Sequence, residues 1–135
     1  MIKINILPKS DCKKDIDVVA KIILIDESKR VLFLKRSDYM TKFAGEWDLP
    51  GGHLMQGESL VEGLKREVLE ETQIKISNET FLKNIENLHF FYANYNSQPV
   101  KLSDEHTEYK FFEKSELDLK QKFQKVAFLA LESKK

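Results

Sequence analysis

Residues 51–74 read GGHLMQGESLVEGLKREVLEETQI, and this stretch decides both the fold and the candidate site of the chain. In its second half, apolar side chains recur every four residues at Leu60, Leu64 and Val68. This spacing places them on one face of an α-helix, so we expect a helix whose apolar face is buried. Ser59 followed by Glu62 is a capping-box pattern, which predicts that the helix begins near Ser59.

Carboxylates lie beside the apolar face of this helix, at Glu67, Glu70 and Glu71. At 3.6 residues per turn the spacing gathers them into an arc of about 100°, where they repel one another at neutral pH. A divalent cation would relieve the repulsion, and oxygen-only ligands favour Mg²⁺ or Mn²⁺. Glutamate-rich helix faces are also common as plain solvated surfaces, so these three residues alone leave both interpretations open.

The glycines of the stretch favour the metal interpretation. Gly51 and Gly52 follow Pro50, and the three residues demand a special backbone path on which a carbonyl can become a ligand. Gly63 lies in the helix interior, where glycine costs up to about 1 kcal/mol relative to alanine. We interpret Gly63 as room for another molecule to approach the carboxylates.

The stretch as a whole resembles the Nudix box, which runs Gly, five residues, Glu, seven residues, Arg-Glu, an aliphatic residue, any residue, Glu-Glu, any residue, Gly and an aliphatic residue. The chain matches this pattern in register at Gly52, Glu58, Arg66, Glu67, Val68, Glu70, Glu71 and Ile74. Gln73 is the exception, because the family usually ends its helix with glycine at this position. Either the Gln73 backbone takes a left-handed conformation or the helix ends differently.

The resemblance implies an α/β fold, the Nudix-type α/β/α sandwich with a mixed β-sheet. It also implies Mg²⁺ or Mn²⁺ as the cofactor, with ligands from Gly51, Glu67, Glu70 and Glu71. A pyrophosphate linkage repels an attacking nucleophile, and the metal would neutralise its negative charge in the transition state.

Further site residues follow from the same resemblance. Arg66 and Glu58 are expected to hold the carboxylates in place by charge-assisted hydrogen bonds, and with Glu71 they form the catalytic part of the box. Substrate contacts are expected at Gly52 and at Arg36, because basic residues near this place can contact phosphates in the family. An ordinary polar strand end is the alternative interpretation of Arg36.

A second acidic segment, SDEHTEYKFF, spans residues 103–112. In the Nudix family, a glutamate in this loop often supplies an additional metal ligand or the general base. Glu105 fits this role best and Glu108 is the reserve, while a box glutamate remains open as the base. A simple polar turn is the alternative interpretation.

The implied activity is hydrolysis of a nucleoside diphosphate linked to another group. Family members that act on ADP-ribose often carry an additional N-terminal dimerisation domain, and we expect none here. A nucleoside triphosphate, intact or damaged, is therefore the favoured substrate, with a monophosphate and pyrophosphate as products. NDP-sugars, ADP-ribose and dinucleoside polyphosphates remain open, and a nucleotide-binding module without turnover is the rival hypothesis.

The chain has 135 residues, which suits a single Nudix domain over residues 1–135. Its 22 basic and 22 acidic residues give a net charge of zero, which argues against nucleic-acid or anionic-membrane partners. Cys12 is the only cysteine, and no apolar run is long enough for a signal peptide or a membrane span. We expect a cytoplasmic monomer or homodimer that binds a small-molecule nucleotide.

Two strands are expected early in the chain. Residues 16–25 and 31–36 are apolar and rich in β-branched side chains, and the polar residues between them predict a hairpin. Residues 1–15 alternate and then break at Pro8, which predicts an edge strand or arm.

The second half of the chain is expected to complete the sheet and cover it. Residues 81–96 predict an aromatic strand that turns at Asn96 and Ser97 into a hairpin with the segment from residue 98 onward. Residues 115–135 carry apolar side chains at helical spacing, which predicts an amphipathic helix packed on the sheet.

Overall fold

The computed structural model describes residues 15–40 and 43–133, so nearly all of the arm expected over residues 1–15 lies outside the described residues, as does Cys12. The elements along the chain are β1 (Asp15–Ile25), β2 (Val31–Arg36), β3 (Trp47–Asp48), β4 (Gly51–Met55), α2 (Leu60–Thr72), β5 (Thr80–Ile85), β6 (Leu88–Asn94), β7 (His106–Phe112), the 3₁₀ helix η2 (Lys114–Glu116) and α3 (Lys122–Ser133).

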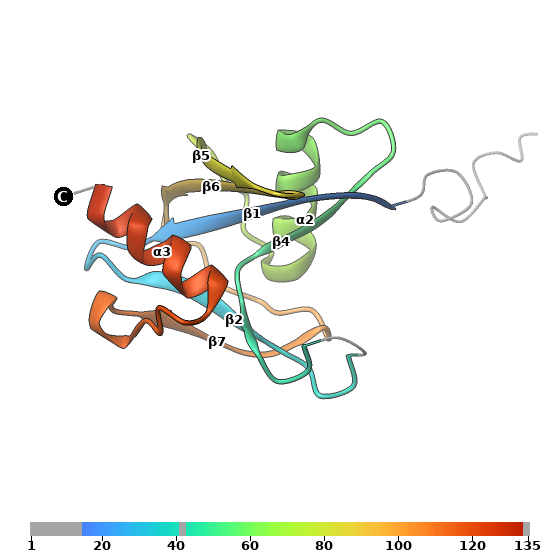
Figure 1. Cartoon of the computed structure of the whole chain (residues 1–135). Helices are drawn as coiled ribbons and strands as arrows, with labels where there is room; N and C mark the ends of the chain where they lie inside the picture. Colours follow the sequence, from blue (N-terminus) through green and yellow to red (C-terminus); the bar gives the residue numbers. More distant parts are fainter. Residues whose placement is uncertain (1–14, 41–42, 134–135) are drawn as a thin grey trace, which may run out of the picture.

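Strand β1 crosses the middle of the molecule and organises a mixed sheet (Figure 1). It pairs in parallel with β6, and antiparallel with β4 and with β2, which it meets at Ile25 and Val31. Strand β2 also pairs with β3 and β7, and β5 closes the other edge by pairing with β6. The described residues therefore form one mixed sheet, as predicted.

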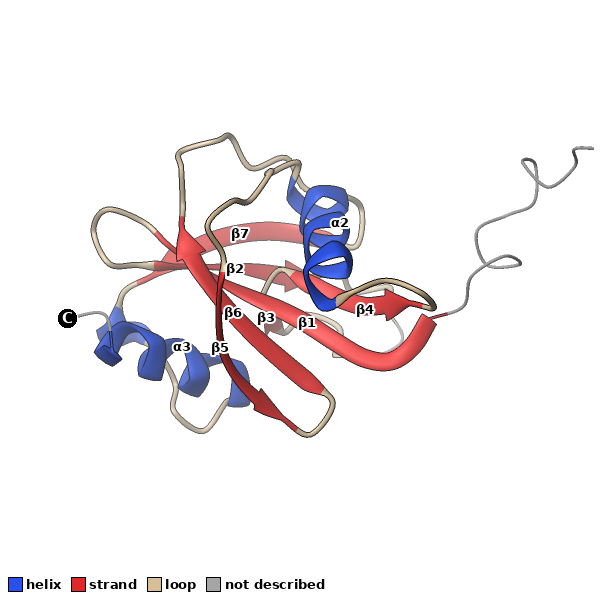
Figure 2. Cartoon of the chain, turned by 90° about the horizontal axis from the view of Figure 1, so that it is seen from above, coloured by secondary structure: helices blue, strands red, loops and turns tan. Residues whose placement is uncertain are grey.

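The two long helices cover opposite faces of this sheet (Figure 2). Successive strand side chains point to opposite faces, so Ile22 and Leu24 of β1 pack with Leu64 and Val68 of α2. Their neighbours on β1 pack instead on the α3 side, with Val126, Ala127, Ala130 and Leu131. Burial of one such aliphatic side chain contributes about 1.5–3 kcal/mol, so both helices are held mainly by their apolar faces. The predicted α/β/α sandwich is confirmed.

Helix α2 begins and ends where the box pattern predicts. The Ser59 hydroxyl accepts a hydrogen bond from the Glu62 N–H while the Glu62 carboxylate accepts one from the Ser59 N–H, which completes the capping box. At the other end Gln73 adopts a left-handed conformation with φ of 65°, and its N–H donates to the Leu69 carbonyl at 2.9 Å. The helix therefore stops with the backbone geometry that glycine usually supplies.

The expected hairpin across Asn96 and Ser97 is wrong, because no strand follows these residues before β7. The aromatic segment holds two strands, β5 and β6, which form a hairpin around Glu86, whose φ is 55°. Residues 95–105 form no strand, because their backbone groups bond elsewhere: the Lys101 N–H, for example, donates to the Thr72 carbonyl at the end of α2. This connection carries the chain past α2 before β7 begins.

Candidate active site

Glu71 joins the end of helix α2 to the start of strand β4. Its side chain is buried, with the residue only 6% exposed, and its Oε1 atom accepts a hydrogen bond from the Gly51 N–H at 3.0 Å. Burial raises the pKa of Glu71 to about 8, because the charged form loses its hydration. The nearby charge of Lys21 and the Gly51 bond oppose this rise, while neighbouring Glu67 adds to it.

Arg66 connects the other carboxylates of the box. Its guanidinium donates to both oxygens of Glu58, at 2.6 and 3.0 Å, and Nη1 also donates to Glu67 at 3.2 Å and to Glu70 at 3.3 Å. Glu58 is held in turn by the Met55 N–H at 2.7 Å. The hydrogen bond with Glu58 raises the pKa of Arg66, and burial raises the pKa of Glu67. Arg66 therefore lies where it can orient carboxylates that would otherwise repel one another.

The glycines of the box allow strand β4 to approach its neighbours closely. A Cβ atom on Gly51, whose φ is 126°, would lie 2.1 Å from the Ala20 carbonyl oxygen. One on Gly52 would lie 2.7 Å from the Glu67 carboxylate carbon. Gly51 has no space for a side chain, so glycine is required where β4 lies against β1, whereas a side chain at Gly52 would displace the Glu67 carboxylate of the acidic helix.

The interpretation of Gly63 as room for an approaching molecule is wrong. A Cβ atom there would lie 2.7 Å from Cγ of Leu54, and 3.2 Å from the Glu58 carboxylate. The space beside Gly63 is thus filled by a core side chain of β4. Its role is the close packing of helix on strand.

Lys21 and Asp48 form a buried ion pair that the sequence analysis did not identify. Lys21 is 6% exposed and lies 3.1 Å from Asp48, and its ammonium also donates to the carbonyls of Leu49 at 3.1 Å and Gly51 at 3.0 Å. The signal was a single lysine inside the apolar run of β1, where an unpaired charge would be costly. Lys21 therefore fastens the turn that presents the Gly51 carbonyl.

Arg36 also contacts this ion pair. Its Nη1 donates to Asp48 at 3.3 Å, and its side chain is only partly exposed. Arg36 thus lies at the end of β2 beside the candidate site, where its phosphate contact stays a prediction.

Loop 103–105 and the first residue of β7 bring two further side chains to Glu71. The ligand atoms of Glu71, Glu105 and His106 all lie within 4.8 Å of one another. Glu108 lies instead on β7, where its carboxylate is 3.5 Å from the Lys35 ammonium. Of the two candidate glutamates, Glu105 is therefore the one that lies beside Glu71.

His106, at the start of β7, is the residue of this cluster that the sequence analysis missed. It is 4% exposed, and burial lowers its pKa to about 4, so the imidazole is neutral at physiological pH. The only signal in the sequence was its position between a candidate ligand and an aromatic strand.

The box residues fit a hard divalent cation. Gly51, Glu67, Glu70 and Glu71 offer only oxygen donors, from one carbonyl and three carboxylates. Burial raises the pKa of both Glu67 and Glu71, so additional positive charge would stabilise their ionised forms. This donor chemistry suits Mg²⁺ or Mn²⁺.

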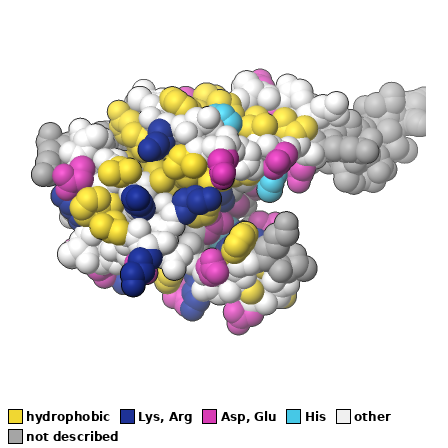
Figure 3. All heavy atoms as spheres, viewed as in Figure 1, with side chains coloured by type: hydrophobic (Ala, Val, Ile, Leu, Met, Phe, Trp, Pro, Cys, Tyr) yellow, Lys and Arg dark blue, Asp and Glu magenta, His cyan; other side chains and the backbone are white. Residues whose placement is uncertain are grey.

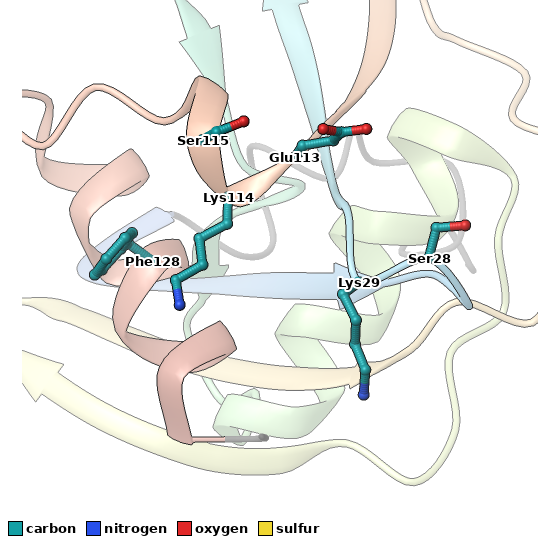
Figure 4. A pocket seen from close by; sticks show the side chains of 6 residues that line it. All are labelled: Ser28, Lys29, Glu113, Lys114, Ser115 and Phe128. Carbon is teal, nitrogen blue, oxygen red and sulfur yellow. The ribbon is translucent and has the colours of Figure 1, made fainter.

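A separate hollow of about 610 Å³ lies away from the box (Figure 4). Its lining comes from the β1–β2 turn, the start of η2 and helix α3, at Ser28, Lys29, Glu113, Lys114, Ser115 and Phe128. The Lys114 ammonium lies 5.2 Å from the Phe128 ring centre and pairs with Glu132. None of the predicted site residues lines this hollow, so we place the candidate chemistry at the box.

The face that carries α3 shows how charged side chains are distributed over the surface (Figure 3). Among the described side chains in this view, lysines and arginines are separated by apolar and acidic ones and form no continuous basic area. No helix in residues 15–40 and 43–133 is both long enough and apolar enough to cross a membrane.

Comparison with known proteins identifies the family. The family model for the NUDIX domain matches residues 15–132, so the chain belongs to the Nudix family and the resemblance in its box is confirmed. Among solved structures, the MutT protein from Methanosarcina mazei Go1 is 30% identical with a TM-score of 0.71, and the match covers 87% of this chain and 93% of that one.

Two curated relatives are similar over shorter stretches. A putative 8-oxo-dGTP diphosphatase from Bacillus subtilis is 45% identical over 53 residues, which cover 39% of this chain and 32% of that protein. The m7GpppN-mRNA hydrolase NUDT17 of Danio rerio is 31% identical over 71 residues, 53% of this chain and 24% of that protein. The chain therefore spans a third or less of the length of these relatives.

Proposed function

We propose that this chain is a hydrolase that cleaves a phosphoric anhydride bond of a nucleotide with the help of Mg²⁺ or Mn²⁺. The observation that carries the proposal is the contact of Gly51 with Glu71, together with the shared contacts of Arg66 to Glu58, Glu67 and Glu70. A binding module would not need every acidic residue of the box held in this way.

The residues of the box have separate tasks in this proposal. When bound, the metal supplies the positive charge that neutralises the phosphates in the transition state. Glu67, Glu70, Glu71 and the Gly51 carbonyl hold it, while Arg66 keeps two of these carboxylates oriented. Gly52 and the nearby Arg36 are the proposed contacts for the substrate phosphates.

The reaction itself is attack of water on phosphorus. The water oxygen forms a bond to one phosphorus, the bond from that phosphorus to the oxygen of the leaving phosphate breaks, and the water's proton passes to a carboxylate. Glu71 and Glu105 are the proposed acceptors, since their oxygens lie within 4.8 Å of each other at the candidate site.

The favoured substrate is a nucleoside triphosphate, intact or oxidised, with a nucleoside monophosphate and pyrophosphate as products. The similarity to the B. subtilis protein supports this choice, because that protein is named as a putative 8-oxo-dGTP diphosphatase. The name of the D. rerio relative, an m7GpppN-mRNA hydrolase, adds the cap of an mRNA as a second candidate.

A nucleotide panel with phosphate and pyrophosphate detection tests the proposal. It contains triphosphates, 8-oxo-dGTP, NDP-sugars, ADP-ribose, dinucleoside polyphosphates and a cap dinucleotide, each with Mg²⁺ and with EDTA. We expect one class to be hydrolysed and Glu71→Gln to lower kcat at least about 100-fold without unfolding the protein, because a metal-centred charge is lost. Glu27→Gln, in the exposed β1–β2 turn, is the matched control. Near-normal turnover by Glu71→Gln would contradict the assignment, and a folded wild type inactive on the whole panel would favour a binding module.

A further inference from the structure

His106 has a buried side chain whose ring nitrogens both lack a hydrogen-bond partner among the described residues. Leaving a buried polar group unpaired is costly, so such groups in native proteins usually have a partner in water, an ion or a ligand. His89 also has an unpaired nitrogen, but it is half-buried on β6 beside the Phe81 ring and belongs to no described cluster of ligands. His106 is different because of what surrounds it.

Two carboxylates converge on the His106 ring. Oxygens of Glu71 and Glu105 lie within 4.8 Å of each other and of a ring nitrogen. Glu71 is itself buried, and a buried carboxylate needs positive charge or several donors to remain ionised. Two carboxylate oxygens and an imidazole nitrogen that lie this close together form a donor set for a cation.

The backbone holds this cluster in place from two sides. The Ser103 N–H donates to the Glu71 carbonyl at 3.2 Å, which fastens the loop to the end of α2. The Ser37 N–H donates to the Glu105 carbonyl at 2.8 Å, which fastens it to the end of β2. Backbone hydrogen bonds to α2 and to the end of β2 therefore fix the segment that carries Glu105.

The pairing of β7 with β2 also contributes to the direction of the His106 side chain. Lys35 pairs with Glu108, but the next residue, Arg36, pairs with His106, so the register shifts between these two pairs. Such a bulge re-aims a side chain that regular alternation would point elsewhere. Here it accompanies an imidazole that faces inward while Glu108 stays at the surface.

We propose that Glu71, Glu105 and His106 bind a divalent transition-metal ion, with a nitrogen of His106 as a direct ligand. This site shares Glu71 with the oxygen-only box and so rests on the proposed function. Because imidazole is a softer donor than carboxylate, the site prefers Mn²⁺, Co²⁺ or Zn²⁺ over Mg²⁺. The oxygen-only site of the box then favours Mg²⁺, and the site that contains His106 favours a transition metal.

Electron spin-echo spectroscopy of bound Mn²⁺ tests the proposal without any nucleotide. The protein is titrated with Mn²⁺ alone, then with excess Mg²⁺, and the Mn²⁺ that stays bound is expected to show coupling to a ¹⁴N nucleus. Wild type grown with ¹⁵N-histidine should change the isotope pattern of that coupling, which assigns the nitrogen to histidine. This measurement needs no variant.

Variants then identify the histidine. His106→Gln should remove the coupling and weaken the Mg²⁺-resistant Mn²⁺ site at least about 10-fold, as loss of a ligand should. His53→Gln is the matched control, because His53 is exposed and lies beside the box glycines, and it should leave the coupling unchanged. Circular dichroism checks that both variants are folded.

The outcomes separate this inference from the proposed function. Bound Mn²⁺ without histidine coupling, or coupling that persists in His106→Gln, would overturn the inference even if nucleotide hydrolysis continues. Histidine-coupled Mn²⁺ in a protein that hydrolyses nothing in the nucleotide panel would support the metal site and count against the hydrolase. Failure to bind Mn²⁺ at all would overturn both.

Discussion

Replacing Lys21 with methionine removes one ammonium and keeps an unbranched side chain of similar length. In the folded protein this ammonium pairs with Asp48 and donates to the carbonyls of Leu49 and Gly51. All of these contacts are buried, so water cannot readily replace the lost donor. Lys21→Met therefore tests whether this ion pair holds the turn before β4.

The expected loss of stability in Lys21→Met depends on the contacts that the buried Asp48 carboxylate keeps. Removing one partner of a buried ion pair typically costs about 3–5 kcal/mol, mostly because the other charge is left buried. Asp48 keeps its contact with Arg36 at 3.3 Å, so we expect the lower end, about 3 kcal/mol. The contacts share one ammonium and do not add separately. For a domain of this size, the midpoint of thermal unfolding should fall by roughly 10 °C.

Urea unfolding in EDTA, followed by circular dichroism, measures this loss for the metal-free protein. Lys83→Met, at an exposed position of β5, is the matched control and should stay within about 0.5 kcal/mol of wild type. The double variant Lys21→Met with Asp48→Asn should lose less than the sum of the single losses, because the two residues interact. A Lys21→Met protein within about 1 kcal/mol of wild type would refute the reasoning.

Three further predictions concern the box. Gln73→Gly should raise the free energy of unfolding by about 0.5–1 kcal/mol, because glycine accepts the left-handed φ of 65° more readily; urea unfolding checks this, and a loss of stability would contradict it. Gly52→Ala should displace Glu67, since its Cβ would lie 2.7 Å from that carboxylate, so hydrolysis should fall at least about 10-fold, and unchanged kcat would count against the close approach. Burial raises the pKa of Glu71 from 4.5 to about 8, so its contribution to stability is complete below pH 4.5 and is lost as pH rises toward 8. Thermal unfolding in EDTA across this range should show a steeper loss in wild type than in Glu71→Gln, in which Glu67 and His106 still titrate with shifted pKa values.

Local sequence was sufficient for the helix and its limits. The capping box at Ser59 and the left-handed residue at position 73 are set by neighbours within one turn, so a pattern of spacing could identify them. The family pattern also pointed to Glu105 in a distant loop, which the fold brings to Glu71. The turn between β5 and β6 was missed because Glu86 carries no glycine or proline signal despite its positive φ.

Residues whose role depends on distant partners could not be assigned from spacing. The role of Lys21 as an ion-pair partner is visible only in the folded protein, where β1 lies beside Asp48, 27 residues later in the chain. His106 faces Glu71 only because residues 95–105 bond to the end of α2 and β7 pairs with β2 through a bulge. In both cases the sequence contained the charged or polar residue, but tertiary packing determined what it contacts.

The charge of Lys21 acts both on the turn at Gly51 and on Glu71 of helix α2. Its ammonium bonds the Gly51 carbonyl on one side, and its charge lowers the pKa of Glu71 against the stronger effect of burial. One buried lysine is thus insufficient to keep Glu71 ionised at neutral pH, since that pKa still rises to about 8. A divalent cation would supply the missing charge and displace the proton, which couples metal binding to deprotonation of the same carboxylate. The fold therefore provides enough fixed positive charge to hold the turn in position, and leaves Glu71 to be neutralised by a proton or by metal.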